Sequence, residues 1–335
     1  MRRYRTVGPG KPGSRHQSSQ SKATVALVNS AASPREDLAR PSRIDVLWIG
    51  TALAFVSASG PIITATAAPA LAIAFWRCFL GSGATGVWVL ARARAEFGAL
   101  SRSQWRLIIL SGLLLGAHFA TWVPSLRFTT VASSTALVAT QPVWAALIAR
   151  ARGVRIERAV WLGMAISLTG VVVLTGVDLS LGPRALVGDA LALLGAVFAA
   201  AYFTTAEQAR KTVSTSTLTF GLYGSAALLL LALCLVLRQP ISGFSLQAWG
   251  LILLLTVTAQ LLGHSLINKV LATTSATVVS LAILFELPGS TLIAAVALGQ
   301  VPSWGVLPAA LLIMTGLVIV IRSSRSAELV EIPPA

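Results

Sequence analysis

The chain has 335 residues, of which 55% are hydrophobic and only 11% are charged. Soluble proteins carry roughly 25% charged residues, so this composition excludes an ordinary soluble domain and makes the lipid bilayer an expected partner. The formal net charge of +15 would suit a nucleic-acid-binding protein, but the basic residues lie in the N-terminal tail and between apolar segments, as topology signals do. We therefore expect no nucleic-acid partner.

The first 43 residues differ from the rest of the chain. Residues 1–43 are rich in Ser, Pro, Gly and Arg and show no apolar periodicity, so we expect a disordered cytoplasmic tail. Arg2-Arg3 opens the chain, but no apolar segment follows soon enough for a secretory or twin-arginine signal. The nine basic residues of this tail favour contact with the anionic inner leaflet of the membrane.

Apolar segments of about 20 residues then follow one another, separated by short polar joints, and each is long enough to cross a bilayer as a helix. Continuous apolar runs of this kind indicate helices, because barrel strands would show a weaker alternating pattern. We therefore predict an all-α polytopic membrane protein with a second short cytoplasmic tail at 323–335. The ten predicted spans are 44–66, 69–91, 104–125, 129–149, 159–177, 188–208, 216–237, 247–267, 273–297 and 304–321.

The basic residues between these spans predict the orientation. With the N-terminus in the cytoplasm, 22 Arg and Lys residues fall inside and 3 fall outside, and Arg77 lies within a span. Cytoplasmic loops carry an excess of Arg and Lys, so this distribution favours cytoplasmic N- and C-termini. We expect a multi-pass protein of the plasma membrane. The three basic residues assigned to the outside are Arg127, Arg184 and Arg238.

The chain contains an internal repeat. An offset of 146 residues places His118 on His264 and Pro142 on Pro288 without a gap. Histidine and proline are rare in this sequence, so their alignment carries more weight than shared Ala or Leu. Five spans per half would insert the second half upside down, which is the usual architecture of secondary transporters. The predicted five-helix repeats cover residues 44–177 and 188–322.

Six short segments, taken in this order along the chain, resemble one transporter group: Phe75-Trp76-Arg77, Thr130 to Ala136 leading to Gln141-Pro142, Gly188-Asp189, Gly263-His264 through Asn268, Glu286-Leu287-Pro288, and Thr315-Gly316-Leu317. The group is the drug/metabolite transporter superfamily, in its EamA branch, and the resemblance covers roughly residues 44–322. It implies export or import of small metabolites. Family members often carry Glu after the glycine that follows spans four and nine, whereas this chain has Val154 and Gln300 there.

Two ionisable residues fall within predicted spans. A carboxyl group in the middle of a span is energetically costly and usually marks function or an ion pair, which makes Glu286 the sharpest signal. A neutral Glu286 could carry a coupling proton, and an ionised one could pair with Arg77 or with a substrate ammonium group. Arg77 could bind a substrate carboxylate bidentately, or it could extend to the outer membrane surface.

Five further polar or aromatic residues are candidates for substrate binding. Trp122 lies four residues after His118, and Gln260 lies four residues before His264, so each pair shares a helix face. Tyr202 could line a cavity, although packing remains an alternative for every one of these side chains. No cluster of metal-ligating residues accompanies the histidines, so we predict no metal site and no cofactor.

Two prolines fall near the middle of their spans. Proline removes a backbone hydrogen bond and clashes with the preceding helical turn, so we expect helix breaks at Pro142 and Pro288. Interruptions at corresponding positions of two repeats often lie next to a transporter's binding site. A static structural kink is the alternative interpretation.

The predicted function is secondary transport. No GxxxxGK[ST] loop is present, which excludes ATP hydrolysis by this chain as the energy source. We expect an exporter of small metabolites, such as amino acids or aromatic compounds, that works by alternating access, with proton coupling as one option. An intramembrane transferase using His and Glu as acid-base groups is the alternative, but no DDxxD or HExxH run is present. A channel or a scaffold is a further alternative.

Overall fold

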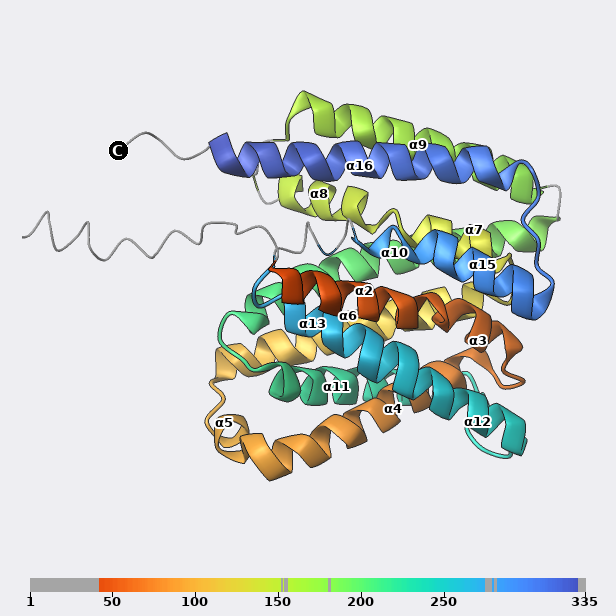
Figure 1. Cartoon of the computed structure of the whole chain (residues 1–335). Helices are drawn as coiled ribbons and strands as arrows, with labels where there is room; N and C mark the ends of the chain where they lie inside the picture. Colours follow the sequence, from red (N-terminus) through yellow and green to blue (C-terminus); the bar gives the residue numbers. More distant parts are fainter. Residues whose placement is uncertain are drawn as a thin grey trace, which may run out of the picture. The chain divides into compact units, whose positions relative to one another are not determined.

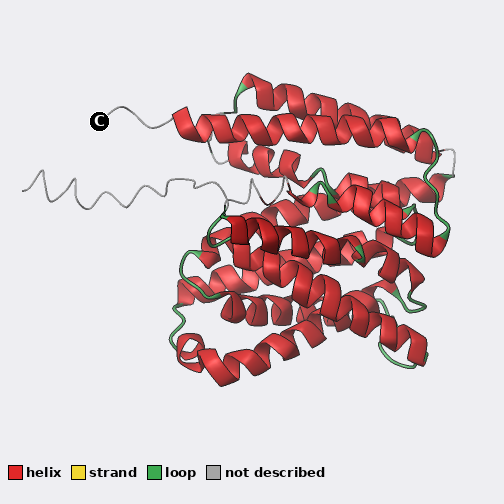
Figure 2. Ribbon diagram, viewed as in Figure 1, coloured by secondary structure: helices red, strands yellow, loops and turns green. Residues whose placement is uncertain are grey.

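The computed structural model describes residues 42–330, apart from 152, 154–155, 180–181, 275–278 and 280–281. Within this part of the chain, all regular secondary structure is helical (Figure 2). Most of the predicted tail, residues 1–41, and the last five residues lie outside the described part, so the predicted disorder of the tail stays a prediction.

Three helices of the first half begin at polar capping residues. Ser42 and Asp45 form a capping box at the start of the first helix, and Ser101 and Gln104 form another. Thr130 caps a later helix by accepting a hydrogen bond from the Ser133 backbone N–H. The bounds are α2 Arg43–Ser57, α3 Ser59–Ala65, α4 Ala70–Trp88, a π-helical turn η1 Val89–Ala93, α5 Arg94–Gly98, α6 Arg102–Ser125, α7 Val131–Val138, α8 Gln141–Ala151 and α9 Arg158–Leu179.

The second half uses the same local signals. Ser214 and Ser245 are N-caps, and Gly299 ends a helix in the left-handed conformation that glycine adopts without strain. A longer π-helical segment interrupts one helix of this half. The bounds are α10 Pro183–Arg210, α11 Thr215–Val236, α12 Leu246–Leu255, η2 Thr256–His264, α13 Ser265–Val270, α15 Glu286–Leu298 and α16 Val306–Val330.

Eight helical segments are long and apolar enough to cross a membrane, and they correspond to the first eight predicted spans. Two shorter apolar helices follow, within the predicted ninth and tenth spans, and part of the ninth lies outside the described residues. The eight segments are Arg43–Ala65, Ala70–Gly98, Arg102–Ser125, Val131–Ala151, Arg158–Asp178, Pro183–Arg210, Thr215–Val236 and Leu246–Val270.

Helices from the two halves pack against each other throughout the described part. The largest contacts join α6 to α10, α9 to α16 and α4 to α11, and Figure 1 shows α9 and α16 side by side. Glycines allow the closest approaches. A methyl group at Gly112 would lie 2.5 Å from the Leu222 carbonyl oxygen, so the backbones of α6 and α11 touch there.

Candidate functional site

Two helices are interrupted beside the prolines singled out above. Helix α7 ends at Val138 and α8 begins at Gln141, so the break lies directly before Pro142. In the second half a two-residue turn precedes Glu286, and Pro288 is the third residue of α15. The first turn of a helix does not need the N–H that proline lacks, so both prolines occupy positions that suit the start of a new helix.

A third irregularity was not predicted from the sequence. Residues Thr256–His264 form a π-helical segment, in which hydrogen bonds span five residues instead of four. This segment carries both Gln260 and His264. A methyl group at Gly263 would lie 2.5 Å from the Val56 side chain, so α2 packs tightly against this segment. Wide turns of this kind are frequent at functional sites.

A small cavity lies between these irregular segments. Its volume is about 40 Å³, so it has room for about two or three water molecules. Five of the seven predicted binding residues line it, and seven further residues do so that were not predicted. The lining consists of Val56, His118, Trp122, Val138, Gln141, Ala199, Tyr202, Phe203, His264, Ile267, Ile283 and Glu286.

The orientation of His118 is fixed by two contacts. Its Nδ1 atom lies 2.9 Å from the Gly195 carbonyl oxygen, and its ring stacks on Trp122 at 5.7 Å with an interplanar angle of 8°. A carbonyl oxygen only accepts hydrogen bonds, so Nδ1 carries the proton and donates it. The neutral ring is therefore left with Nε2 as an acceptor.

Tyr202 and His264 are joined through Asn268. The Asn268 Nδ2 group donates to the Tyr202 hydroxyl oxygen at 2.7 Å and to the His264 carbonyl oxygen at 2.8 Å. Since the Tyr202 oxygen already accepts a hydrogen bond, its own proton is free to be donated elsewhere. Asn268 was quoted only as part of a motif, and the structure adds it as the residue that positions two of the lining groups.

Glu286 lies at the cavity wall with only 7% of its surface exposed. Among the described residues, no side chain forms a hydrogen bond or an ion pair within 4 Å of its carboxyl group. The Arg77 guanidinium acts on it only through space. The pairing of Glu286 with Arg77 that the sequence left open is therefore not formed here, and the carboxyl group is available to a proton or a cationic ligand.

Arg77 is fully buried, so it does not extend to the membrane surface. Its Nε atom donates to the Gln260 Oε1 atom at 2.8 Å, and its Nη1 atom donates to the Ser59 hydroxyl at 3.3 Å. The guanidinium carbon lies 4.2 Å from the centroid of the Phe119 ring. Neither Arg77 nor Gln260 lines the cavity. The structure thus divides the predicted set into five lining residues and two residues behind the wall.

The described residues include no group of three or more His, Cys, Asp or Glu side chains placed to hold a metal ion. The Phe119 ring is a neighbour of both histidines of the cavity wall, with ring centroids 5.1 Å from His118 and 5.5 Å, edge-on, from His264. The chemistry of this site is therefore that of hydrogen bonds, one carboxyl group and aromatic faces.

Comparisons with known proteins settle the family. A family model described as the EamA-like transporter family matches residues 43–176 and 186–322. The chain belongs to this family. The resemblance stated from the sequence is thereby confirmed, and this EamA-like protein is a multi-pass membrane transporter of the drug/metabolite type.

No curated protein matches this EamA-like protein. A solved crystal structure of another protein is similar, with 21% sequence identity and a TM-score of 0.59, over 84% of this chain and 99% of that chain. This likeness shows the fold alone. Within the EamA-like protein, the cavity is lined by residues of both matched segments, for example Trp122 from the first and Tyr202 from the second.

Proposed function

We propose that this protein is a secondary carrier that exports small metabolites, such as amino acids or aromatic compounds, by alternating access of two inverted five-helix halves. The observation that carries the proposal is the cavity: residues of both family segments line it, and Glu286 stands at its wall without a partner. Substrate sites of inverted-repeat transporters lie at such an interface between halves.

The pattern of helix contacts supports the division into two related halves. Helix α6 packs on α10, and its counterpart segment η2 packs on α2. Helices α7 and α8 contact α10, just as α15 contacts α2 and α3. The pairs α4 with α11 and α9 with α16 each join equivalent helices of the two halves. A pseudo-twofold axis relating the halves generates this reciprocal pattern.

The small size of the cavity supports alternating access. An amino acid is several times larger than the water molecules for which the cavity has room, so the site has to widen to take one. Widening requires helix segments to move. The interrupted helices beside Pro142 and Pro288 end at the cavity wall, where Gln141 and Glu286 begin their helices, so these segments are the ones we expect to move.

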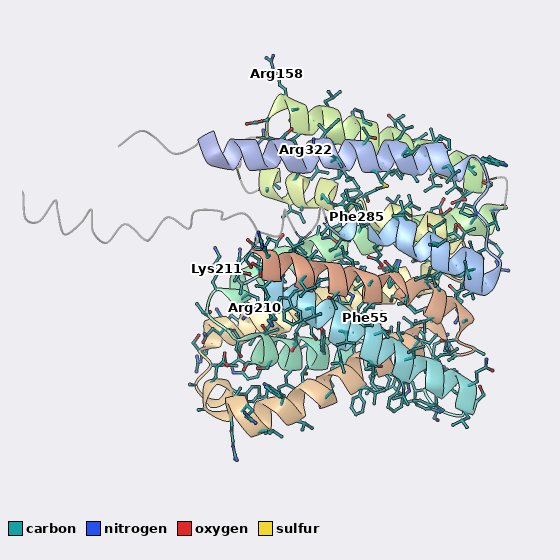
Figure 3. The ribbon with its side chains drawn as sticks, in the orientation of Figure 1. Phe55, Arg158, Arg210, Lys211, Phe285 and Arg322 are labelled. Carbon is teal, nitrogen blue, oxygen red and sulfur yellow. The ribbon has the colours of Figure 1, made fainter. Side chains whose placement is uncertain are left out.

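The orientation of the carrier follows from its charges. We place the protein in the plasma membrane with both termini in the cytoplasm, because 22 of the basic residues fall on that side in the predicted topology. Figure 3 supports this placement, since Arg158, Arg210 and Lys211 all lie toward the same end of the helices. All three are assigned to the inside.

Counterflow in proteoliposomes tests the proposed function. The purified protein would be reconstituted into proteoliposomes, and these would be loaded with a mixed pool of labelled amino acids and small metabolites. Exchange would be measured with and without a pH gradient. We expect saturable counterflow that responds to the gradient in the wild type and loses this response in Glu286→Gln, because an amide carries no titratable proton. Glu157→Gln is the matched control, since Glu157 is exposed and distant from the cavity lining in the described structure.

The outcomes separate the possible functions. Counterflow without any pH response in the wild type would support a carrier but contradict proton coupling. Folded wild-type protein that shows no counterflow of any solute would contradict the proposed function and would favour the transferase or scaffold interpretation.

A further inference from the structure

Arg77 is a buried cation for which the described structure supplies no anion. It is 0% exposed, and its printed partners are the neutral groups of Gln260 and Ser59 together with the face of the Phe119 ring. No carboxyl group of the described residues lies within 4 Å of it. Burying an unpaired charge is strongly unfavourable, so a site of this kind gains much from an anionic ligand.

Three buried hydrogen-bond donors, on Arg77, on its partner Gln260 and on the cavity-lining Trp122, are without acceptors among the described residues. The Arg77 Nη2, Gln260 Nε2 and Trp122 Nε1 atoms are buried and have no hydrogen-bond partner in the described part of the chain. Each of these atoms only donates. The orientation of the Gln260 amide is fixed, because its oxygen accepts from Arg77 and its nitrogen must therefore point elsewhere. What the cluster lacks is a group with several acceptor positions and negative charge.

The Phe119 ring is a neighbour both of the Arg77 guanidinium and of the cavity wall, and Trp122 is the one donor of the three that already lines the cavity. One side of the ring faces the Arg77 guanidinium at 4.2 Å, and its neighbours on the cavity side are His264 at 5.5 Å and Trp122 at 6.5 Å between centroids. Phe119 is itself fully buried and does not line the cavity. Displacement of this one ring would join the cavity to the donor cluster.

The two ends of the joined space have opposite chemistry. The donor cluster of Arg77, Gln260 and Trp122 is positive and lacks an acceptor, whereas the Glu286 carboxyl group at the cavity wall is an acceptor that lacks a donor. A solute that carries both a carboxylate and an ammonium group satisfies both ends. A carboxylate accepts parallel hydrogen bonds from a guanidinium group, which makes it a better fit than a spherical anion.

We propose that Arg77, Gln260 and Trp122 form a carboxylate subsite next to the cavity, opened by displacement of the Phe119 ring, so that the carried solute is a zwitterion with its ammonium group toward Glu286. This inference rests on the proposed carrier function and adds the chemical class of the solute. Two other anions could pair with the Arg77 guanidinium: chloride, and the carboxyl group of Glu286 after a conformational change. The experiment below distinguishes them.

Ligand-induced thermal stabilisation of the purified full-length protein in detergent measures binding without requiring transport. Four matched probe sets would be compared: the standard L-amino acids, their amides, the corresponding decarboxylated amines and the corresponding acids without the amino group. A fifth arm would contain sodium chloride alone. We expect the amino acids to raise the unfolding temperature more than any other set, and the amides and amines to bind at least about 30-fold more weakly.

Two variants test the subsite itself. Arg77→Gln should weaken amino-acid binding by about 30-fold or more, because the partner of a buried carboxylate is removed. Gln260→Glu places a carboxyl group on a side chain that already contacts Arg77 at 2.8 Å, so it should raise the unfolding temperature without ligand and abolish the response to amino acids. Arg94→Gln removes an exposed guanidinium from the following helical segment and should behave as the wild type.

Several results would overturn the subsite. The first is that amides or amines stabilise the protein as much as amino acids do, and the second is that chloride alone gives the full stabilisation. The third is that Gln260→Glu binds amino acids as the wild type does. The fourth is that no carboxylate stabilises a protein that unfolds cooperatively. Stabilisation in the wild type that disappears in Glu286→Gln and persists in Arg77→Gln would assign the ligand to Glu286 alone and also contradict it. Binding of amino acids without counterflow would instead contradict the carrier function and leave the subsite standing.

Discussion

Single residues in this site illustrate what a rare polar side chain in an apolar span can and cannot indicate. Glu286 stood out in the sequence because a carboxyl group is costly within a bilayer, His118 because the repeat aligns it with a second histidine, and Trp122 because it shares a helix face with His118; all three line the cavity. Val56 and Ile283 line it as well, but apolar residues in apolar spans look the same whether they face lipid, core or cavity. No sequence pattern separates them.

Residues that lie near the cavity without lining it are a second case. The helical spacing of Gln260 and His264 suggested one shared face, yet only His264 reaches the cavity. Gln260 lies in the π-helical segment and is held by Arg77 through its side chain, while its carbonyl oxygen accepts from the Tyr223 hydroxyl at 3.1 Å. Spacing rules for an α-helix do not describe a segment with wider turns, so this placement required the structure.

At the residue scale, we predict that Asn268→Asp lowers the free energy of unfolding by about 1–3 kcal/mol, since a carboxylate cannot donate to the Tyr202 hydroxyl or the His264 carbonyl oxygen. Tyr202→Phe is the matched comparison. It removes one acceptor and leaves the second hydrogen bond of Asn268 in place, so its cost should be smaller. Thermal unfolding in detergent measures both, and an equal or larger loss for Tyr202→Phe would contradict the expected order.

At the scale of helices, hydropathy predicted most segments well. The predicted span at 104–125 corresponds to α6 Arg102–Ser125, and the span at 216–237 corresponds to α11 Thr215–Val236. The interrupted helices were harder to predict. Hydropathy shows which residues are apolar, but it does not show which backbone groups form hydrogen bonds with each other. It therefore could not predict the π-helical segment η2.

The two tightest joints of the predicted topology prove to be linked by one side chain. Arg127, in the joint after α6, donates from Nη2 to the carbonyl oxygens of Thr66 at 2.7 Å and Ala68 at 3.1 Å in the joint before α4. Its Nη1 atom reaches the Thr64 carbonyl oxygen. Burial lowers the pKa of Arg127 from its usual value. The sequence assigned Arg127 to an outer loop but gave no sign that it closes the neighbouring one.

The contact between helices α9 and α16 is the one for which a glycine gives the clearest prediction of a change in stability. A methyl group at Gly316 would lie 2.4 Å from the Gly163 carbonyl oxygen and 2.4 Å from the Ser167 backbone nitrogen. We expect Gly316→Ala to lower the free energy of unfolding by about 1–3 kcal/mol, because backbone atoms cannot move aside as a flexible side chain would.

Gly176→Ala is the matched control, since a methyl group there meets nothing within 4 Å. It replaces glycine by alanine within α9, and helix propensity alone would make it neutral or slightly stabilising. Unfolding temperatures of the two variants in detergent make the comparison. Equal temperatures for Gly316→Ala and the wild type would show that the contact relaxes at no cost.

At the scale of the whole molecule, composition and charge alone predicted a polytopic helical membrane protein, and the family comparison agrees. The rare residues aligned by the internal offset pointed to two halves, and the family model indeed matches two successive segments. The sequence could not predict that the cavity has a volume of only about 40 Å³, because this depends on how far the helices approach each other.

The topology can be tested with single cysteines. Cys78 and Cys234 are buried, so a variant with alanine at both positions gives a silent background. In that background, we expect Ser242→Cys to react with a membrane-impermeant maleimide on intact cells, because this exposed residue follows the outer Arg238. Ser103→Cys, exposed beside Arg102 on the predicted inner side, should react only after permeabilisation. The reverse pattern would invert the orientation, and labelling of both on intact cells would contradict the span count between them.

The contact between Gly163 and Gly316 has a mechanical consequence. Two helices whose backbones touch have no slack for sliding or tilting against each other, since any displacement meets main-chain atoms. Helices α9 and α16 come one from each family segment. In the proposed transport cycle we therefore expect these two helices to keep their relative position, so that the movement of the two halves has to be taken up by other helices.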